Sequence, residues 1–312
     1  MINKILDATI YFSFDKSGFK RHEKYFEPLK KKPYENKSIL ITGGTSGIGL
    51  SVAVELYHLG AEVIVTGRDL EKYKKNLSDL DLTVDDISFL HLDLLDFDSL
   101  SKFVGTVQRD IKHIDTFICN AGAMPNEKNL IRNYDSIFAS QVVAHYYLIR
   151  KFIESDLIHG GHISLNASGG MYPVKLDLSD LTWNKSEYDK VNSYAIAKRA
   201  QVILNEEMAA KYSDQLFSCS HPGWVDTPGL KDSLESFWKF TKDRLRDPVQ
   251  GADTLVWLAG RGENLESGKF WFDRRARSTY LFPFTKEDQQ EREKLKDLLD
   301  KEYEYIDSLN KG

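Results

Sequence analysis

The sequence has few of the features that mark a secreted or membrane-spanning protein. Its only cysteines are Cys119 and Cys219, each inside a short apolar run, which predicts buried reduced thiols rather than a disulfide or a metal site. No run approaches the roughly 20 apolar residues that cross a bilayer. The first residues also lack the basic-then-apolar order of a secretory signal, so we expect a cytoplasmic location.

The chain also lacks an excess of positive charge. Its 312 residues carry 42 Lys+Arg against 47 Asp+Glu, a formal net charge of -5. That balance argues against a protein that binds nucleic acid phosphates along a basic surface, so any phosphate site should be local. No group of His, Cys and Asp residues has the spacing of metal ligands, and no metal is expected.

What is present is an alternation of short β-branched runs and longer segments with apolar residues at helical spacing. We therefore expect an α/β protein with a Rossmann-like, doubly wound parallel sheet of about seven strands, with helices on both faces and in a single domain. The expected strands are residues 38–42, 62–67, 87–93, 115–122, 161–168, 216–222 and 268–273. The expected helices are residues 48–59, 70–80, 97–111, 134–153, 188–212 and 249–258.

Three segments depart from this alternation, which otherwise covers residues 37–284. The leader, residues 1–36, has apolar residues near helical spacing, and we expect it to pack on the sheet or on a second subunit. A helix lying on a membrane surface is the alternative. Residues 228–247 predict an amphipathic insertion after the sixth strand, and residues 285–312 predict a charged C-terminal helix on the outside of the protein.

A glycine-rich turn follows the first expected strand. In such a unit of strand, turn and helix, backbone N–H groups at the helix N-terminus meet a diphosphate. A side chain at Gly47 or Gly49 would hold the diphosphate away from the turn, or the helix away from the strand. The turn therefore predicts a dinucleotide site made by Gly43, Thr45, Ser46, Gly47, Ile48 and Gly49.

The end of the second expected strand indicates which dinucleotide binds. About 20 residues past the glycines, such a site carries an acid for NAD or an arginine for the 2′-phosphate of NADP. Here the strand ends in Gly67 and Arg68, and the arginine offers a fork suited to a phosphate, while Asp69 is expected to cap the next helix. NADP(H) is therefore the expected cofactor, with NAD(H) as the alternative.

A tyrosine and a lysine stand four residues apart in the helical segment 188–212. That spacing places Tyr194 and Lys198 on one face, where a nearby ammonium favours the phenolate and lowers the pKa of the tyrosine. Ser168 ends the strand before this helix, at the edge of the sheet where ligands bind. Its hydroxyl could hold a carbonyl oxygen beside Tyr194.

These motifs, with "TGGTSGIG", "LDL", "NAG" and "HPGWVDT" in order, resemble those of the short-chain dehydrogenase/reductase family over nearly the whole chain. The long separation of Ser168 from Tyr194 resembles the retinol-dehydrogenase-like branch. The resemblance implies further cofactor contacts at Asp93, Leu94, Asn120, Ala121, Gly122, Tyr194, Lys198, Pro222, Gly223, Val225 and Thr227. It also implies that Tyr194 exchanges a proton with the substrate oxygen, Lys198 holds the nicotinamide ribose, and Ser168 orients the carbonyl.

One position departs from the pattern that the resemblance implies. The family carries a catalytic asparagine in the helix after the "NAG" strand, followed by a glycine, and this chain has Gln141 and Ala144 there. The asparagine lies where its helix is distorted, and the freed carbonyl holds a water that relays protons toward the lysine. Gln141 either keeps a working relay or makes the proton step slow. A nucleotide-binding scaffold or redox sensor without fast turnover is therefore the alternative function.

Apolar residues near the expected site favour a lipophilic carbonyl or alcohol substrate. The insertion contributes Leu230, Leu234, Phe237, Trp238 and Phe240, and the segment between Ser168 and Tyr194 contributes Met171, Tyr172 and Leu176. The alternative is that these faces simply pack on the core. The resemblance also implies a homodimer as one state of assembly, joined through the helices after the fourth and fifth strands.

Overall fold

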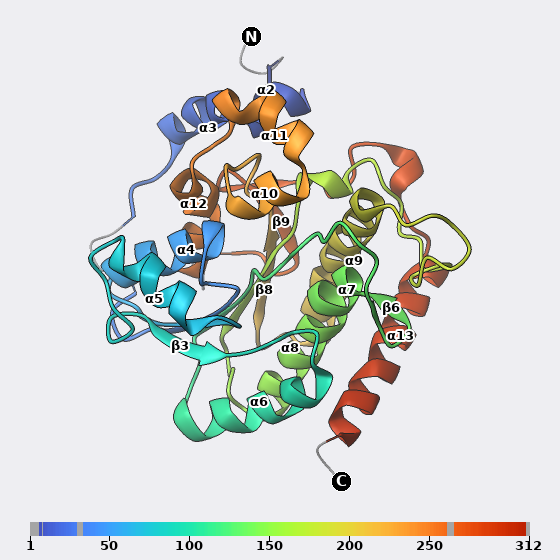
Figure 1. Cartoon of the computed structure of the whole chain (residues 1–312), viewed down its shortest axis with the longest axis horizontal. Helices are drawn as coiled ribbons and strands as arrows, with labels where there is room; N and C mark the ends of the chain where they lie inside the picture. The colour runs from blue at the N-terminus through green and yellow to red at the C-terminus, as the bar shows by residue number, and fades with distance from the viewer. Residues whose placement is uncertain (1–5, 8, 30–33, 261–264, 310–312) are drawn as a thin grey trace.

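A mainly parallel sheet with helices on both faces forms the centre of the protein (Figure 1). This computed structural model describes residues 6–7, 9–29, 34–260 and 265–309. The sheet has eight strands in the order β10-β9-β8-β7-β4-β1-β2-β3. They are β1 (Ser38–Thr42), β2 (Glu62–Gly67), β3 (Ser88–His91), β4 (Thr116–Cys119), β7 (His162–Asn166), β8 (Leu216–Ser220), β9 (Lys269–Phe272) and β10 (Arg275–Arg277).

The two faces of the sheet bury separate sets of side chains. Because neighbouring residues of a strand point to opposite faces, Ile39 and Ile41 enter one apolar cluster and Leu40 enters the other. The first cluster includes side chains from α4 (Gly47–His58), α5 (Leu70–Ser78) and α12 (Pro248–Ala259). The second includes side chains from α6 (Phe97–Asp110), α8 (His145–Glu154), α9 (Lys190–Lys211) and α13 (Gln289–Ser308).

The predicted α/β fold is confirmed, with two local differences. An eighth strand, β10, pairs antiparallel with β9, because Asp273 and Arg274 between them both adopt left-handed backbone angles and turn the chain back. The helix predicted over residues 134–153 is divided into several short elements. These are the hairpin β5 (Leu130–Ile131) and β6 (Tyr134–Asp135), then α7 (Ser136–Phe138), the π-helix η2 (Ala139–Ala144) and α8.

The C-terminal helix α13 is an outer helix with one buried face. Leu295, Leu299 and Ile306 are at most 2% exposed, and they pack in the cluster that also holds α6 and α8. Arg150 of α8 donates to Asp300 of α13 at 2.7 Å. The helix therefore covers part of α8, one of the helices through which a homodimer was expected. Within the described ranges, no helix has both the length and the apolar character needed to span a bilayer.

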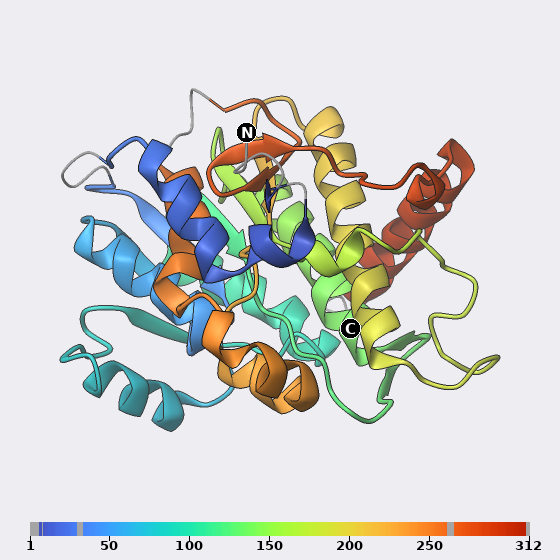
Figure 2. The same cartoon turned by 90° about the horizontal axis from the view of Figure 1, so that it is seen from above.

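The leader packs against the insertion and the end of the sheet, as Figures 1 and 2 show in blue and orange. The ring of Phe14 lies 4.6 Å from the ring of His221 and 5.1 Å from that of Phe272. Tyr11 meets Trp224 edge to face at 5.6 Å. The elements involved are α2 (Ile10–Phe14), α3 (Lys16–His22), η1 (Glu23–Tyr25), α10 (Pro228–Ser233), α11 (Glu235–Thr241) and η4 (Lys242–Arg244).

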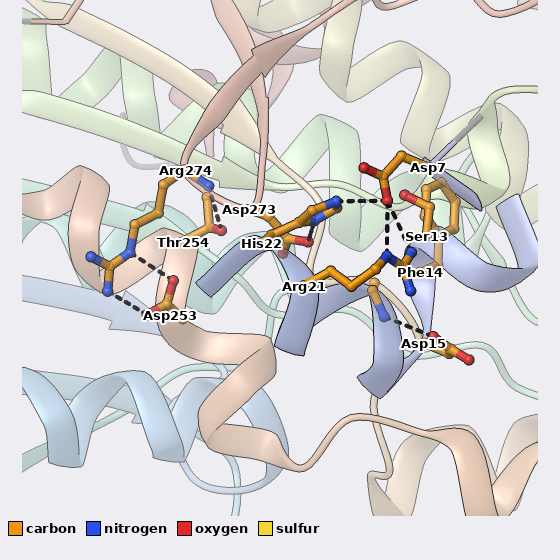
Figure 3. Close-up of polar contacts among 12 residues, drawn as sticks. Asp7, Ser13, Phe14, Asp15, Arg21, His22, Asp253, Thr254, Asp273 and Arg274 are labelled. Carbon is orange, nitrogen blue, oxygen red and sulfur yellow. Dashed lines mark hydrogen bonds and ion pairs between the residues drawn. The ribbon is translucent and has the colours of Figure 1, made fainter. Parts of the chain in front are cut away.

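A buried group of charges fixes the leader in this place. The guanidinium of Arg246 donates to the carbonyls of Ser13 and Phe14, at 3.0 and 2.9 Å, and to both carboxylate oxygens of Asp273. His22 lies between two acids, with Nδ1 2.6 Å from Asp273 and Nε2 3.1 Å from Asp7 (Figure 3). The leader is therefore tied to the core by charge as well as by aromatic packing.

The ionised form of Asp273 should contribute to stability at neutral pH. Burial alone would raise the pKa of this carboxyl, but Arg246 and His22 outweigh it and lower the pKa to about 2. A pKa below the unfolded value of about 3.9 means that the contribution is present above that pH and disappears as the pH falls toward 2.

We expect Asp273→Asn to lower the free energy of unfolding by about 3 to 5 kcal/mol, because it leaves the buried guanidinium of Arg246 without its counter-ion. Urea unfolding at pH 7 measures this loss. Glu71→Gln is the control, since it breaks an exposed pair with Lys74 and should change stability little. Equal effects of the two substitutions would contradict a role of the buried pair in holding the leader.

Candidate functional site

A cleft of about 960 Å³ opens at the carboxyl edge of the sheet, near the neighbouring strands β1 and β4. From this pair the chain adds β2 and β3 on one side and β7, β8 and β9 on the other. Ligands of doubly wound sheets bind in this crevice. Every predicted site residue except Gln141 lines it. From the sequence analysis these are Gly43, Thr45, Ser46, Gly47, Ile48, Gly49, Arg68, Asp93, Leu94, Asn120, Ala121, Gly122, Ser168, Tyr194, Lys198, Pro222, Gly223, Val225 and Thr227.

The glycines of the first turn stand where side chains do not fit. Gly43 has a φ of +64°, and a Cβ there would lie 2.8 Å from the Cα of Ala121. A Cβ on Gly49 would lie 2.3 Å from the carbonyl oxygen of Gly43. The helix α4 is therefore able to begin directly against the end of β1 and the loop after β4.

The N-terminus of α4 has the features of an anion site. Ser46 is the N-cap residue, and its side chain makes no capping hydrogen bond, so the first N–H groups of this 12-residue helix remain available on the cleft side. The turn is held from behind by Asn76, which donates to the carbonyl of Thr45 at 2.8 Å. The turn and helix thus fit the diphosphate of a dinucleotide.

Arg68 lies at the end of the cleft past β2. Its side chain is 66% exposed, and its nearest acid is Asp93, at 3.9 Å. Asp69 accepts from the N–H of Lys72 at 2.9 Å, which confirms that it caps α5. Arg68 is therefore open to solvent on the cleft side, in a position to meet a ligand phosphate.

Asn120 joins three strand ends beneath the cleft. Its Nδ2 donates to the carbonyls of Thr42 and Gly43, both at 3.1 Å, and its Oδ1 accepts from Asn166 at 2.9 Å. The ends of β1, β4 and β7 are thereby fixed relative to one another. This arrangement explains structurally why an amide follows β4.

Ser168, Tyr194 and Lys198 come together at the other end of the cleft. Ser168 follows β7, where its hydroxyl accepts from the backbone N–H of Gly170 at 3.1 Å, and it lines the cleft together with Tyr194 on α9. The ammonium of Lys198, one turn along α9, lies 5.3 Å from the centre of the Tyr194 ring. Burial raises the pKa of Tyr194 above its usual value, and the nearby hydroxyl of Ser168 opposes only part of that rise. The lowering of this pKa by Lys198 that the sequence predicted is therefore wrong for this structure. The three predicted groups are therefore neighbours, as the spacing indicated.

The amine of Lys198 is buried. The residue is 3% exposed, and its Nζ donates to the carbonyl of Asn166 at 2.8 Å and to Oε1 of Gln201 at 2.9 Å. Burial lowers the pKa of this amine to about 7. The amine can therefore change its charge near neutral pH, and small changes in its surroundings decide its state.

Gln141 lies in the π-helix η2, so the backbone opens at the position where the family resemblance places a distorted turn. Its side chain does not line the cleft but lies against two residues that do: it donates to the carbonyl of Ala123 at 2.8 Å, and a Cβ on Gly122 would lie 3.1 Å from its Cδ. The freed carbonyl of Gln141 accepts from Nε2 of Gln201 at 2.8 Å and from Nδ1 of His145 at 3.0 Å. An amide of the protein thus stands where a relay water was expected.

Two histidines near the site are packing residues. His145 is fully buried between Gln141 and Thr42, and burial lowers its pKa to about 4. His221 stacks on Phe272 with ring centres 4.0 Å apart, and burial lowers its pKa to about 3. Both rings are therefore neutral at pH 7.

Several residues of the site differ from the sequence expectation. Met171, Tyr172 and Leu176 belong to the core, at most 3% exposed, instead of lining the cleft. Gln201 was missed, although its place three residues after Lys198 on one helix could have revealed it. Trp224 was also missed as a lining residue, because its sequence neighbours gave no sign of its direction.

The insertion lines the mouth of the cleft with part of its apolar face. Leu230, Leu234 and Phe237 face the cleft. Trp238 instead donates to Asp226 at 2.8 Å, and Phe240 is 78% exposed. The predicted apolar face therefore contributes three of its five side chains.

Comparison with known proteins identifies the family. A sequence model described as short chain dehydrogenase matches residues 37–174. The chain is 34% identical over 275 residues to human Dehydrogenase/reductase SDR family member 12, a match that covers 86% of each chain. The chain belongs to the short-chain dehydrogenase/reductase family. It is thus an oxidoreductase acting on CH–OH groups.

Further comparisons agree with this family. Human retinol dehydrogenase 13 is 24% identical over 260 residues, which cover 77% of each chain. A crystal structure from Escherichia coli CFT073, described as a short chain dehydrogenase complexed with NADPH, superposes with a TM-score of 0.63 at 18% identity. That match covers 79% of this chain and all of the other, and it supports the fold alone.

We expect Gln141→Asn to change kcat by less than roughly tenfold, about 1.4 kcal/mol in the barrier. The reason is that Gln141 is connected to Lys198 through its backbone carbonyl, which accepts from Gln201, and the substitution retains that carbonyl. Steady-state turnover of the two proteins with one carbonyl substrate measures the change. A gain far above tenfold would show that glutamine at this position impairs the proton step.

Proposed function

We propose that the protein is an NADP(H)-dependent oxidoreductase that interconverts a ketone or aldehyde and an alcohol on a lipophilic small molecule. The observation that carries this proposal is the meeting of Ser168, Tyr194 and Lys198 at one end of a cleft. The glycine turn stands at the same cleft, so a dinucleotide bound there would reach these groups.

In the proposed reaction the three side chains have separate tasks. The bound nicotinamide supplies or accepts a hydride. Tyr194 donates its phenolic proton to the substrate oxygen during reduction and takes it back during oxidation. Ser168 holds and polarises the carbonyl, while Lys198 binds the nicotinamide ribose and, as an ammonium, favours the phenolate.

The substrate end of the cleft supports a lipophilic ligand. Leu230, Leu234 and Phe237 line it together with Met124 and Trp224. One relative in the comparison is a retinol dehydrogenase by name, which is consistent with such a substrate. We also propose that the protein does not bind nucleic acid, since its net charge is -5. A cytoplasmic location stays a prediction from the pattern of the first residues.

A scaffold or redox sensor without fast turnover is the second candidate. The observation that favours it is the departure at Gln141, where an amide of Gln201 takes the expected place of a relay water. The presence of Ser168, Tyr194 and Lys198 favours the enzyme, because a scaffold needs none of the three. Turnover by the unmodified protein separates the two candidates.

We expect the unmodified protein to oxidise NADPH with lipophilic ketones or aldehydes, and Tyr194→Phe to abolish that turnover while cofactor binding persists. The substitution removes only the transferable proton. Absorbance at the NADPH band measures turnover across a carbonyl panel, and NADPH fluorescence measures binding. Turnover retained by Tyr194→Phe would place the acid elsewhere, and activity confined to sugars or charged hydroxy acids would contradict the lipophilic assignment.

We expect Arg68→Ala to weaken NADPH binding by about 1.5 to 3 kcal/mol, the loss of a charge-assisted hydrogen bond, and to leave NADH binding nearly unchanged. Fluorescence titration with both cofactors measures the difference. Lys74→Ala is the matched control, since it removes a positive charge from the following helix, where Lys74 pairs with Glu71. Equal NADPH and NADH affinities in the unmodified protein would remove the basis for the preference.

A further inference from the structure

Gln201 lies on α9 directly behind the groups of the proposed site. It is fully buried, and its side-chain amide makes two hydrogen bonds of opposite direction. Its Oε1 accepts from the ammonium of Lys198 at 2.9 Å, and its Nε2 donates to the backbone carbonyl of Gln141 at 2.8 Å. One amide therefore connects the buried amine to the opened turn of η2.

The direction of this amide is set by the backbone. The carbonyl of Gln141 can only accept, so it requires the NH₂ end of Gln201 to face it. The oxygen of the amide must then face Lys198. The reversed amide would place NH₂ against the ammonium and oxygen against the carbonyl oxygen, so that both contacts would be repulsive. The π-turn thus fixes the acceptor that Lys198 meets.

The titratable groups around this amine carry no compensating charge at neutral pH. They are Tyr194 on the same helix, Cys119 of β4, Cys219 of β8 and His145 behind the π-turn. Burial raises the pKa of both thiols, and it lowers that of His145. In the described part of the chain, Lys198 forms no ion pair with a carboxylate. Its charge therefore depends on neutral acceptors.

Gln201 supplies one of two such acceptors, and the carbonyl of Asn166 supplies the other. Removing either dipole would make the charged amine less stable in its buried place and would lower its pKa. The Asn166 carbonyl is part of the sheet and cannot be removed by substitution. Gln201 is the acceptor that a side-chain change can test.

We propose that Gln201 is a positioning residue of this site, which holds Lys198 charged and directed at the cleft from the opened turn of η2. That this site is catalytic rests on the proposed function, but the test of Gln201 does not require turnover. Gln201 is fully buried and does not line the cleft, so it acts through Lys198.

Two substitutions and one control test this role. Gln201→Met keeps the approximate shape of the side chain and removes the acceptor for Lys198. Gln201→Glu keeps an oxygen facing Lys198 but removes the NH₂ donor to the carbonyl of Gln141. Asn205→Leu is the matched control, since Asn205 is also fully buried on α9 but donates to the carbonyl of Lys269, away from Lys198. Thermal melting reports whether each variant is folded.

The first readout is the titration of Lys198 itself. Protein labelled with ¹³C at the lysine Cε is titrated by NMR, and the Lys198 signal is assigned by its loss in Lys198→Ala. We expect the Lys198 midpoint to fall by about 0.5 pH units or more in Gln201→Met. It should remain at or above the original midpoint in Gln201→Glu, and it should not move in Asn205→Leu.

The second readout is the NADPH dissociation constant, measured by fluorescence without any turnover. We expect Gln201→Met to weaken NADPH binding roughly three- to tenfold, because the ammonium is no longer directed at the ribose. Asn205→Leu should bind as the original protein does. An unchanged midpoint and affinity in folded Gln201→Met would overturn the proposal, as would an equal shift in Asn205→Leu.

If Gln201→Met does not fold, Gln201→Glu provides the test. A fall of the Lys198 midpoint in Gln201→Glu would also overturn the proposal. Failure of the proposed function has a different signature. It would appear as no turnover by the unmodified protein on any carbonyl, while the NMR titration would still report whether Gln201 holds Lys198.

Discussion

The amine of Lys198 is buried beside the cleft, and its surroundings provide dipoles rather than a counter-ion. A buried charge of this kind costs several kcal/mol unless hydrogen bonds replace its hydration. The carbonyl of Asn166 and the amide of Gln201 provide those bonds. Each of them is fixed in turn, the first by its place in β7 and the second by the π-turn. A carbonyl of the sheet and a side chain of α9 thus meet at one nitrogen atom, and the π-turn holds that side chain.

Much of the fold and of the cleft could be predicted from the sequence, because the signals there are local. Alternating β-branched runs and helical patterns predicted the parallel sheet. The glycines predicted a turn that a Cβ would block, and the contacts of Gly49 confirm this, whereas at Gly47 a Cβ would meet only Thr227 at 3.4 Å and the φ of +55° is what favours glycine. The spacing of Tyr194 and Lys198 predicted one shared helix face. These inferences need only the periods of strand and helix.

Other parts depend on contacts between distant segments and could not be predicted. Apolar residues between Ser168 and Tyr194 gave no sign of whether they face the cleft or the core, and Met171 and Tyr172 face the core. The leader was expected to pack on the sheet or on a second subunit, but the sequence could not name Trp224, the partner of Tyr11, which lies more than 200 positions further along the chain. A helical period does not reveal a π-turn, so residues 134–153 were predicted as one helix.

The π-turn also determines where this part of the chain can change in length. A π-turn holds one residue more than an α-helical turn of the same span, so deleting one residue of Ala139–Ala144 would leave an α-helical turn and keep α8 in phase. A deletion between Leu148 and Phe152 has no such extra residue to remove, and it would rotate the rest of α8 by about 100°. Phe152, which is now fully buried, would then turn out of the core. A shorter chain is therefore better tolerated at η2 than in the helix after it, but it would close the opened turn whose carbonyl Gln201 meets.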